Sequence, residues 1–519
     1  MGKGLVVLVN PGHDDEVNQK IARSYGARSR RVPREDPPIS IINLGGYIRD
    51  HGFDVVILDT HVVRDYKERL KDLVREKPLV IGFSVILGKY LKNAMSLTRL
   101  VKELDGDVPV VWGGKLVYLG KDLILDQMDV DFLVLGDGEI PFLRLLNCLR
   151  EGKDYRSIAG LGFKDNGRTV LNLDLEPVAN LDSLYISQDC GWDLVKDYVN
   201  FRQIPYFINL YTSRGCKYNC SFCYLQDIKG LSNKIRFRRR SAESIIKEID
   251  YLHNKFGINV VTFGDDDFLT DLQGILPVFE YLRRNRIYIE HVWTNVNNLK
   301  PEAIDLLAGI CQTVCYSIET ISPRLQKILR KSIQSAKIME VNRQLRRVGI
   351  NTVHNILFGV PTETDVETRA NIEILMELKK INPHVRANTY ILTPIPETPI
   401  FKFAKKLTGA DIPYDLEDLA NFHFRYLGRV ASKFRPYFNP EDNQFYETVS
   451  ELTNELFTEL NTDMTEEQRV RIQASDRLQY IFAEVENVDK PVDRTRKYIL
   501  DKIIDAMDAG QPLPAIEPF

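Results

Sequence analysis

Short runs of Val, Ile, Leu and Phe alternate with stretches of helical periodicity through the first third of the chain. The runs are continuous and bounded by turn residues, which is typical of strands buried on both faces of a parallel sheet. Amphipathic stretches such as 41–51 and 92–104 lie between them. We therefore predict a doubly wound, Rossmann-like α/β domain in this region. Its predicted strands lie at 5–9, 54–58, 79–84, 108–112 and 131–135.

Glycines gather where several of these predicted strands end. Ligands in doubly wound folds bind at the carboxyl ends of the strands, and glycine there lets the backbone approach a phosphate or a planar ring. Ordinary tight turns between strands and helices explain the same glycines, so both interpretations stay open. The glycines concerned are Gly82, Gly113, Gly114, Gly136 and Gly138.

The middle of the chain carries a second set of strand-like runs. Six runs, centred near 208, 261, 291, 316, 356 and 391, alternate with helical patterns and predict a partial (β/α)6 barrel. From about 400 the pattern becomes mainly helical, with a good amphipathic period over 447–460 and aromatic-rich stretches at 422–426 and 434–438. The prolines at 512, 514 and 518 predict a poorly ordered end. We predict three domains, at 1–180, 181–400 and 401–519, the last being substrate-related.

Composition narrows the class of protein. At about 150 residues per domain, 519 residues allow three domains with real cores, and 44% hydrophobic and 27% charged residues argue against wholesale disorder. A net charge of −3 gives no reason to expect a nucleic-acid partner, and no apolar run approaches the roughly 20 residues of a membrane span. The first apolar run is too short for a signal peptide. We therefore expect a cytoplasmic protein whose seven cysteines are not disulfide-bonded.

Three of those cysteines share one loop. Cys216, Cys220 and Cys223 stand at positions i, i+4 and i+7, directly after the run near 208. Three thiolates can hold three irons of a 4Fe–4S cluster, which leaves the fourth iron open to another ligand. A structural zinc site would need a fourth Cys or His at matching spacing, and nearby stands only His253, inside a helical pattern. The zinc interpretation is therefore disfavoured, and buried core cysteines are disfavoured further.

The pattern Cys216-x-x-x-Cys220-x-Phe222-Cys223 resembles the signature of radical S-adenosylmethionine (SAM) enzymes, and the resemblance continues over roughly 200 residues. It implies a 4Fe–4S cluster and SAM, which together make a 5′-deoxyadenosyl radical. It also places Asp265 and Asp266 near the SAM amine. Glu319, in an otherwise apolar run, would be costly unless paired, so we expect a ligand or an arginine partner for it. The further cofactor-binding residues implied are Thr294, at a strand end, Glu319, near the amine or ribose, and Gly359, near adenine.

The N-terminal region resembles that of the cobalamin-dependent (B12-binding) radical SAM enzymes, which implies a cobalamin cofactor. One departure matters: the Asp-x-His-x-x-Gly loop that supplies a cobalt ligand in many cobalamin proteins is replaced here by residues 12–16, which do not match. We interpret His61, after the second strand, as a surface residue. The resembling segments are 37–39, 82–84, 112–114 and 136–139. The cofactor-binding residues implied are Ser84, Gly113, Gly114, Gly136, Gly138 and Glu139.

The favoured reaction is methylation of an unactivated carbon in a small biosynthetic substrate, with flavodoxin or ferredoxin as the one-electron donor. A radical cyclase, mutase or oxidase of the same family is the alternative, and a metal-containing RNA-binding or scaffold protein is the alternative from another class. Methylthio transfer is disfavoured because it implies three further N-terminal cysteines, where this chain has only Cys148. We interpret Cys311 and Cys315 as buried core residues, and the basic run 236–240 as a solvated face.

Overall fold

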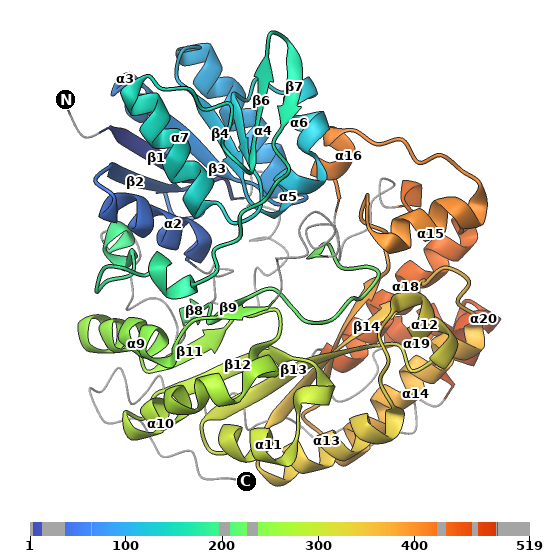
Figure 1. Cartoon of the computed structure of the whole chain (residues 1–519). Coiled ribbons are helices and arrows are strands. Elements are labelled where there is room, and N and C mark those ends of the chain that lie inside the picture. Colours follow the sequence, from blue (N-terminus) through green and yellow to red (C-terminus); the bar gives the residue numbers. More distant parts are fainter. Residues whose placement is uncertain are drawn as a thin grey trace. The chain divides into compact units, whose positions relative to one another are not determined.

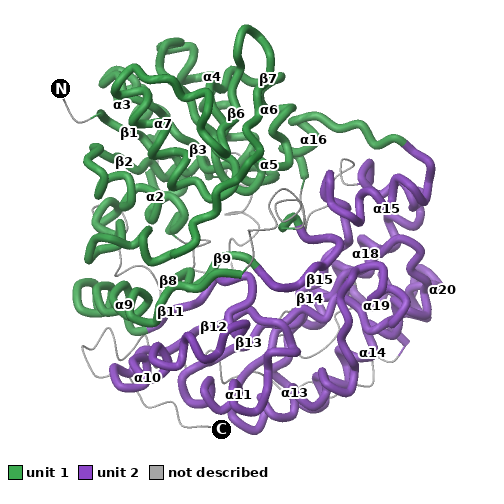
Figure 2. The backbone as a smooth tube through the Cα atoms, viewed as in Figure 1, with its two compact units in different colours: residues 1–215, 224–259, 411–431 green, residues 216–223, 260–410, 432–519 purple. Residues whose placement is uncertain are grey.

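The chain divides into two compact units, which interleave along the sequence (Figure 2). The computed structural model describes residues 4–12, 37–63, 65–196, 208–225, 237–422, 432–458, 466–483 and 485. The loop at 13–16, Arg236, the aromatic residues of 423–426 and the prolines at 512, 514 and 518 lie outside these ranges. The first unit comprises 1–215, 224–259 and 411–431, and the second 216–223, 260–410 and 432–519. Domain boundaries at 180 and 400 stay a prediction.

The first unit is built on a seven-stranded sheet in the order β2-β1-β3-β4-β5-β6-β7 (Figure 1). The first five strands are parallel, and each matches a run that the sequence predicts. Their order reverses at β1, which is the strand order of a doubly wound fold and confirms that class. The strands are β1 Leu5–Asn10, β2 Asp54–Asp59, β3 Val80–Ser84, β4 Val110–Gly113, β5 Phe132–Val134, β6 Leu161–Asp165 and β7 Arg168–Leu171.

Helices connect these strands and cover the sheet. Helix α2 packs against α7, and α3 against α4. Trp112 of β4 is fully buried and donates its indole N–H to Thr98 Oγ1 of α4 at 2.9 Å. The helices of this unit are α2 Ile39–Asp50, α3 Tyr66–Arg75, α4 Lys89–Leu104, α5 Lys115–Leu119, α6 Lys121–Gln127, α7 Glu139–Glu151, α9 Ala242–Phe256 and α16 Leu416–Ala420.

Strands β6 and β7 form an antiparallel hairpin at one edge of the sheet, which the sequence analysis did not predict. Asn166 and Gly167 form its turn with φ of 49° and 77°. Two consecutive positive φ values define a type I′ turn, for which Asn-Gly is the preferred pair. The Asn-Gly pair was therefore the available signal.

Helix α16 returns late in the sequence to the first unit. It packs against α4 and α6. The backbone N–H of Gly88 donates to the carbonyl of Leu419 at 3.0 Å, and that of Leu416 to Gln127 Oε1 at 3.2 Å. Leu416 and Leu419 are buried there, so this short helix completes the packing of the N-terminal sheet's unit.

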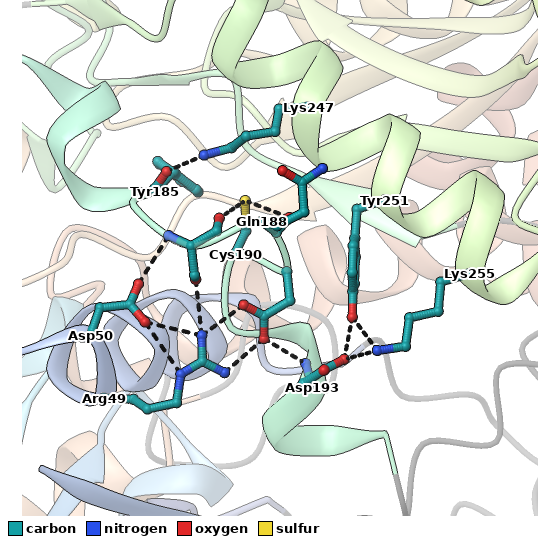
Figure 3. Close-up of polar contacts among 11 residues, drawn as sticks. Arg49, Asp50, Tyr185, Gln188, Cys190, Asp193, Lys247, Tyr251 and Lys255 are labelled. Carbon is teal, nitrogen blue, oxygen red and sulfur yellow. Dashed lines mark hydrogen bonds and ion pairs between the residues drawn. The ribbon is translucent and has the colours of Figure 1, made fainter. Parts of the chain in front are cut away.

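A connecting segment forms side-chain contacts with both α2 and α9 (Figure 3). It contains two short 3-10 helices, η1 Leu181–Leu184 and η2 Trp192–Val195. On one side, Arg49 of α2 donates to both carboxylate oxygens of Asp189 at 2.7 Å. On the other, Asp193 accepts from Lys255 of α9 at 2.5 Å and from Tyr251. The segment is therefore bound by ion pairs on both sides.

The second unit contains five parallel strands that alternate with helices, in the order β15-β14-β13-β12-β11. They match the last five of the six predicted runs, while the first run contains β8 Ile208–Leu210, in the first unit. The strands are β11 Val260–Phe263, β12 Tyr288–Thr294, β13 Cys311–Glu319, β14 Asn351–Phe358 and β15 Arg386–Ile391. The helices are α10 Leu276–Arg284, α11 Pro301–Leu307, α12 Pro323–Leu329, α13 Ser335–Arg347, α14 Asp365–Ile381, α15 Pro399–Thr408, α18 Pro440–Thr458, α19 Glu466–Gln473 and α20 Asp476–Phe482.

Helix α18 packs against strand β15. Its Asn454 side chain accepts from the backbone N–H of Thr389 at 2.8 Å and donates to the carbonyl of Thr389 at 3.1 Å. One amide thus replaces a neighbouring strand at this residue, which protects the strand from pairing with another chain. Among the described helices, none has the length and apolar character needed to cross a bilayer.

Candidate active site

The cysteine loop is anchored to the second unit by the residues between its second and third cysteines. Ser221 donates its hydroxyl to the carbonyl of Ile328 at 2.7 Å and its N–H to that of Leu329 at 2.9 Å. Phe222 packs against a hydrophobic cluster of Leu325, Leu329, Leu357, Val360, Leu392 and Ile400. Cys216, Cys220 and Cys223 stay half-buried. The aromatic residue before the third cysteine therefore fixes the loop while the thiols stay accessible.

Cys220 lies in a mixed electrostatic environment. Burial raises the pKa of its thiol to about 11, the charge of Lys331 opposes this, and Glu319 and Cys216 add to it. Iron binds the thiolate, so cluster assembly must displace a proton that this site holds firmly. Among the described residues, no three His, Cys, Asp or Glu side chains converge as ligands of one metal ion do. A four-iron cluster spans several atoms, so its thiolates need not converge in that way.

Asp267 is the last of three consecutive aspartates, 265–267, that follow β11, and it organises the strand ends. Its buried carboxylate accepts from Thr294 Oγ1 at 2.7 Å and from Asn298 Nδ2 at 2.8 and 3.0 Å. Asn298 Oδ1 in turn accepts from Lys217, beside Cys216 in the loop, at 2.9 Å. This chain of polar contacts links the ends of β11 and β12 to the cysteine loop. Asp267 and Asn298 were not among the predicted site residues, although the run of three aspartates marks this turn in the sequence.

The two aspartates that the resemblance placed near the SAM amine differ from one another. Asp265 is 2% exposed and its side chain is engaged within the protein, whereas Asp266 faces solvent. Thr294 gives its hydroxyl to Asp267. The assignment of these three residues to SAM stays a prediction.

Glu319 ends β13 in a strained conformation. Its φ is +63°, in the left-handed region, and the register between β13 and β14 shifts between Ser317 and Glu319. Strain of this kind is found at functional sites, where the surrounding structure enforces it. The carboxylate accepts from Lys331 Nζ at 3.0 Å, and the two side chains are 7% and 10% exposed. The expected partner is therefore present but is a lysine, not an arginine.

Gly359 follows β14 with φ of +71°, which a side chain would disfavour. A Cβ there would also lie 3.1 Å from the ring of Phe438, and Tyr437 donates its hydroxyl to the carbonyl of Gly359 at 3.3 Å. Glu363 holds the turn by accepting from the N–H of Val360 at 2.9 Å, and burial raises its pKa to about 8. The aromatic pair at 437–438 thus packs on the turn that the resemblance assigns to adenine.

A row of neutral polar side chains crosses three strands of the second unit. Asn355 donates to Ser317 Oγ at 3.1 Å and accepts from Asn388 at 3.4 Å, and all three are partly exposed. The opposite face of the same strands packs on helices, since Thr352 donates to Asn342 of α13 at 3.2 Å. The row therefore lies on the face of these strands opposite to the one that contacts α13, and strand periodicity alone does not reveal it.

The glycines of the N-terminal sheet divide into positions where a Cβ would be crowded and positions where it would meet ordinary packing contacts. A Cβ on Gly114 would meet the carbonyl of Val85 at 2.8 Å, and one on Gly136 would meet Leu175 at 3.3 Å, so their conformations serve the protein's own packing. At Gly113 and Gly138 the nearest atoms belong to Val134, at 3.9 and 3.6 Å. Gly113 and Gly138 are therefore compatible with a group placed beside them, and their assignment to cobalamin stays a prediction. Ser84 lies beside Gly113 in the sheet register.

Glu139 is buried at the start of α7, where its carboxylate accepts from Arg214 at 2.6 and 3.0 Å. Its neighbour Asp137 accepts from Arg214 at 3.2 Å and from Arg238 at 2.5 Å. Burial acts to raise the pKa of Asp137, but the charges of Arg214 and Arg238 outweigh it and lower that pKa. The carboxylate of Glu139, predicted to bind a cofactor, is thus engaged by an arginine.

Two surface interpretations were wrong. Arg240, of the run interpreted as a solvated face, has its side chain 1% exposed and pairs with Glu248 at 2.5 Å. The imidazole of His61 is 3% exposed and lies 3.2 Å from Asp59 Oδ1. In both cases a nearby carboxylate, Glu248 for Arg240 and Asp59 for His61, allows the polar side chain to be buried.

Two cysteines outside the loop were predicted to be buried core residues. Cys311 and Cys315 are 6% and 4% exposed in β13, which confirms them as core residues. Cys148 lies in α7, partly exposed.

Comparisons with known proteins agree with this arrangement. Residues 210–375 match the family model of the radical SAM superfamily, and residues 30–146 match that of the B12 binding domain. An uncharacterized methyltransferase, PH0819, from Pyrococcus horikoshii is 27% identical over 73% of this chain and 80% of its own length. An anaerobic magnesium-protoporphyrin IX monomethyl ester cyclase from Synechocystis is 23% identical over 72% of each chain.

A solved structure shares the fold over nearly the whole chain. The radical SAM methyltransferase TsrM from Kitasatospora setae, with cobalamin and a 4Fe–4S cluster bound, is 20% identical and has a TM-score of 0.65. The match covers 95% of this chain and 92% of that one. With both family models matched in the expected order, and the cysteine loop and doubly wound sheet in place, the chain belongs to the cobalamin-dependent (B12-binding) class of radical SAM enzymes.

Proposed function

We propose that this protein transfers a methyl group from SAM to an unactivated carbon of a small-molecule substrate. The observation that carries the proposal is the union in one chain of the three-cysteine loop and a doubly wound sheet, each within a region that matches its family model. Methylthio transfer is disfavoured, since the N-terminal 180 residues contain only Cys148.

When bound, the cluster and SAM supply a 5′-deoxyadenosyl radical, and cobalamin supplies a carrier for the methyl group. Cys216, Cys220 and Cys223 hold three irons. Glu319 and Lys331 neutralise one another beside Cys220, and they match the ammonium and carboxylate of an amino acid. In this proposal Glu319 takes the SAM amine and Lys331 the SAM carboxylate.

The substrate and the electron donor belong to the proposal as well. The row Ser317, Asn355 and Asn388 offers hydrogen bonds without charge, on the face of the strands opposite to the one that contacts α13. We assign to it the orientation of the ligand held in the barrel. The electron comes from a one-electron donor such as flavodoxin or ferredoxin.

The test uses the full chain, reconstituted anaerobically with iron, sulfide and hydroxocobalamin, and incubated with SAM and a low-potential reductant. We expect 5′-deoxyadenosine, and S-adenosylhomocysteine only when cobalamin is present. Formation of 5′-deoxyadenosine without cobalamin-dependent S-adenosylhomocysteine would favour a cyclase, mutase or oxidase. Cys223→Ala should lose iron and both products, and a variant that retained full function would leave only a scaffold role.

A further inference from the structure

The residues that flank the cysteine loop on either side are held by turns of the N-terminal sheet. Before the loop, Arg214 is separated from Cys216 only by Gly215, which has a φ of +84°. After the loop, Tyr224 follows Cys223 directly. Arg214 and Tyr224 both belong to the first unit, as do the residues that hold them.

The upstream tie is a closed network of ion pairs. Glu139 binds both terminal nitrogens of Arg214, at 2.6 and 3.0 Å, in the bidentate geometry that suits a guanidinium. Asp137 bridges Arg214, at 3.2 Å, and Arg238, at 2.5 Å. The two arginines stand opposite each other in a short antiparallel pair, β9 Ser213–Arg214 and β10 Arg238–Arg239.

The network closes through the backbone of Val178. Arg238 donates to its carbonyl at 2.7 Å, and its N–H donates to Asp137 at 2.9 Å. The side chains of Glu139, Asp137 and Arg238 are 6%, 12% and 12% exposed. Ion pairs at this depth are little screened by solvent, and loss of one partner leaves a buried charge uncompensated. Breaking this network should therefore cost more stability than breaking an exposed surface pair.

The downstream tie comes from the turn after β4, which contains Gly113 and Gly114. Lys115, directly after Gly113 and Gly114 at the start of α5, places its ammonium 4.9 Å from the centre of the Tyr224 ring. This is a cation–π distance. The turn after β5 thus holds the chain where it enters the loop, and the turn after β4 holds it where it leaves.

We propose that Asp137, Glu139 and Lys115 form a clasp that positions the cluster loop, and that Glu139 acts in this way rather than as a ligand of the cofactor. This rests on the proposed function, since it concerns the loop that holds the cluster. The clasp sets the two chain ends from which Cys216 and Cys223 project. A displacement of either end would move the thiolates that would hold the cluster, and a small displacement at a reacting group lowers turnover steeply.

The experiment compares the reconstituted full-length protein with Glu139→Gln and Lys115→Met. Glu176→Gln is the matched control, because Glu176 forms an exposed ion pair with Arg144. Iron and cobalt per chain are measured, together with the electron paramagnetic resonance spectrum of the reduced cluster with and without SAM. We expect Glu139→Gln to keep its cobalt, to alter the SAM-induced change in the spectrum, and to form 5′-deoxyadenosine about tenfold more slowly. Lys115 is exposed, so Lys115→Met tests the clasp without threatening the fold.

The outcomes separate the two proposals. A wild-type protein without iron or SAM cleavage contradicts the proposed function itself. If the wild type is functional and both variants have the same spectrum and the same rate as the wild type, the clasp is overturned. A Glu139→Gln protein that loses cobalt while its cluster spectrum is unchanged also overturns the clasp and makes Glu139 a cofactor ligand. If Glu139→Gln does not fold, the Lys115→Met spectrum decides: a change supports the clasp, and no change refutes it.

Discussion

The buried imidazole of His354 should make the second unit less stable as the pH falls. His354 lies in β14, fully buried, with its ring 4.4 Å from that of Tyr316. Burial lowers its pKa from 6.5 to about 3, because the charged imidazolium would lose its hydration. Between these values the unfolded chain binds the proton more readily than the folded one. Stability from this residue is therefore complete above pH 6.5 and is lost as the pH falls toward 3.

The size of the effect follows from the two pKa values. Their difference corresponds to about 5 kcal/mol of unfolding free energy once the pH is below 3. At pH 5 the loss is already about 2 kcal/mol, because the unfolded histidine is then almost fully protonated. Glu363 acts in the opposite direction: its raised pKa, about 8, means that its contribution is lost as the pH rises from 4.5 to 8.

The assay isolates His354 by comparing two proteins. His354→Phe keeps the ring volume and removes the titration, so the difference between the variant and the wild type cancels Glu363. Urea unfolding, followed by circular dichroism at pH 7.5 and pH 5, should shift that difference by about 2 kcal/mol in favour of the variant at the lower pH. His51→Phe, at an exposed histidine, is the control. A difference that changes by less than about 0.5 kcal/mol between the two pH values would refute the reasoning.

Three further predictions concern the site. Lys331→Met should lower the free energy of unfolding by about 3–5 kcal/mol, because it leaves the buried Glu319 unpaired. The double variant Lys331→Met/Glu319→Gln should recover stability, measured by thermal unfolding, but not SAM affinity, measured by equilibrium dialysis. Asp267→Asn should lower the melting temperature and the iron content, because it breaks the hydrogen bonds that Asp267 accepts. Asp266→Asn, at the exposed neighbour, should leave the melting temperature unchanged. Equal effects of the two substitutions would contradict the central role of Asp267. Glu363→Gln should gain stability relative to wild type as the pH rises from 5 to 9, with the same urea assay, and a constant difference would show that the carboxyl titrates normally.

Local sequence pattern was sufficient for the strands and the cluster loop. Buried parallel strands are continuous apolar runs, so β1 to β5 and β11 to β15 are visible in the sequence, and ligand spacing is a local property that identifies Cys216, Cys220 and Cys223. The hairpin β6–β7 was missed because its strands are short and one is partly exposed, although Asn166-Gly167 marked its turn.

The partners of buried charges were less predictable, because they are chosen by tertiary packing. Asp265, Asp266 and Asp267 are equivalent in the sequence, and only the folded turn distinguishes the one that meets Thr294. The burial of Glu319 indicated that it needs a partner. That the partner is Lys331 depends on where α12 ends, which the sequence pattern does not reveal. Glu139 and Arg214 are 75 residues apart, a separation at which no periodicity links two side chains.

The return of α16 to the first unit has a practical consequence for shortening this protein. A chain cut after the barrel, near residue 410, would lose Leu416 and Leu419, which are buried against α4 and α6. Such a truncation would uncover apolar surface on the N-terminal sheet's unit, far away in sequence, and invite aggregation. A minimal version should therefore carry residues 411–422 grafted back through a linker, and truncation alone will misreport the role of the C-terminal region.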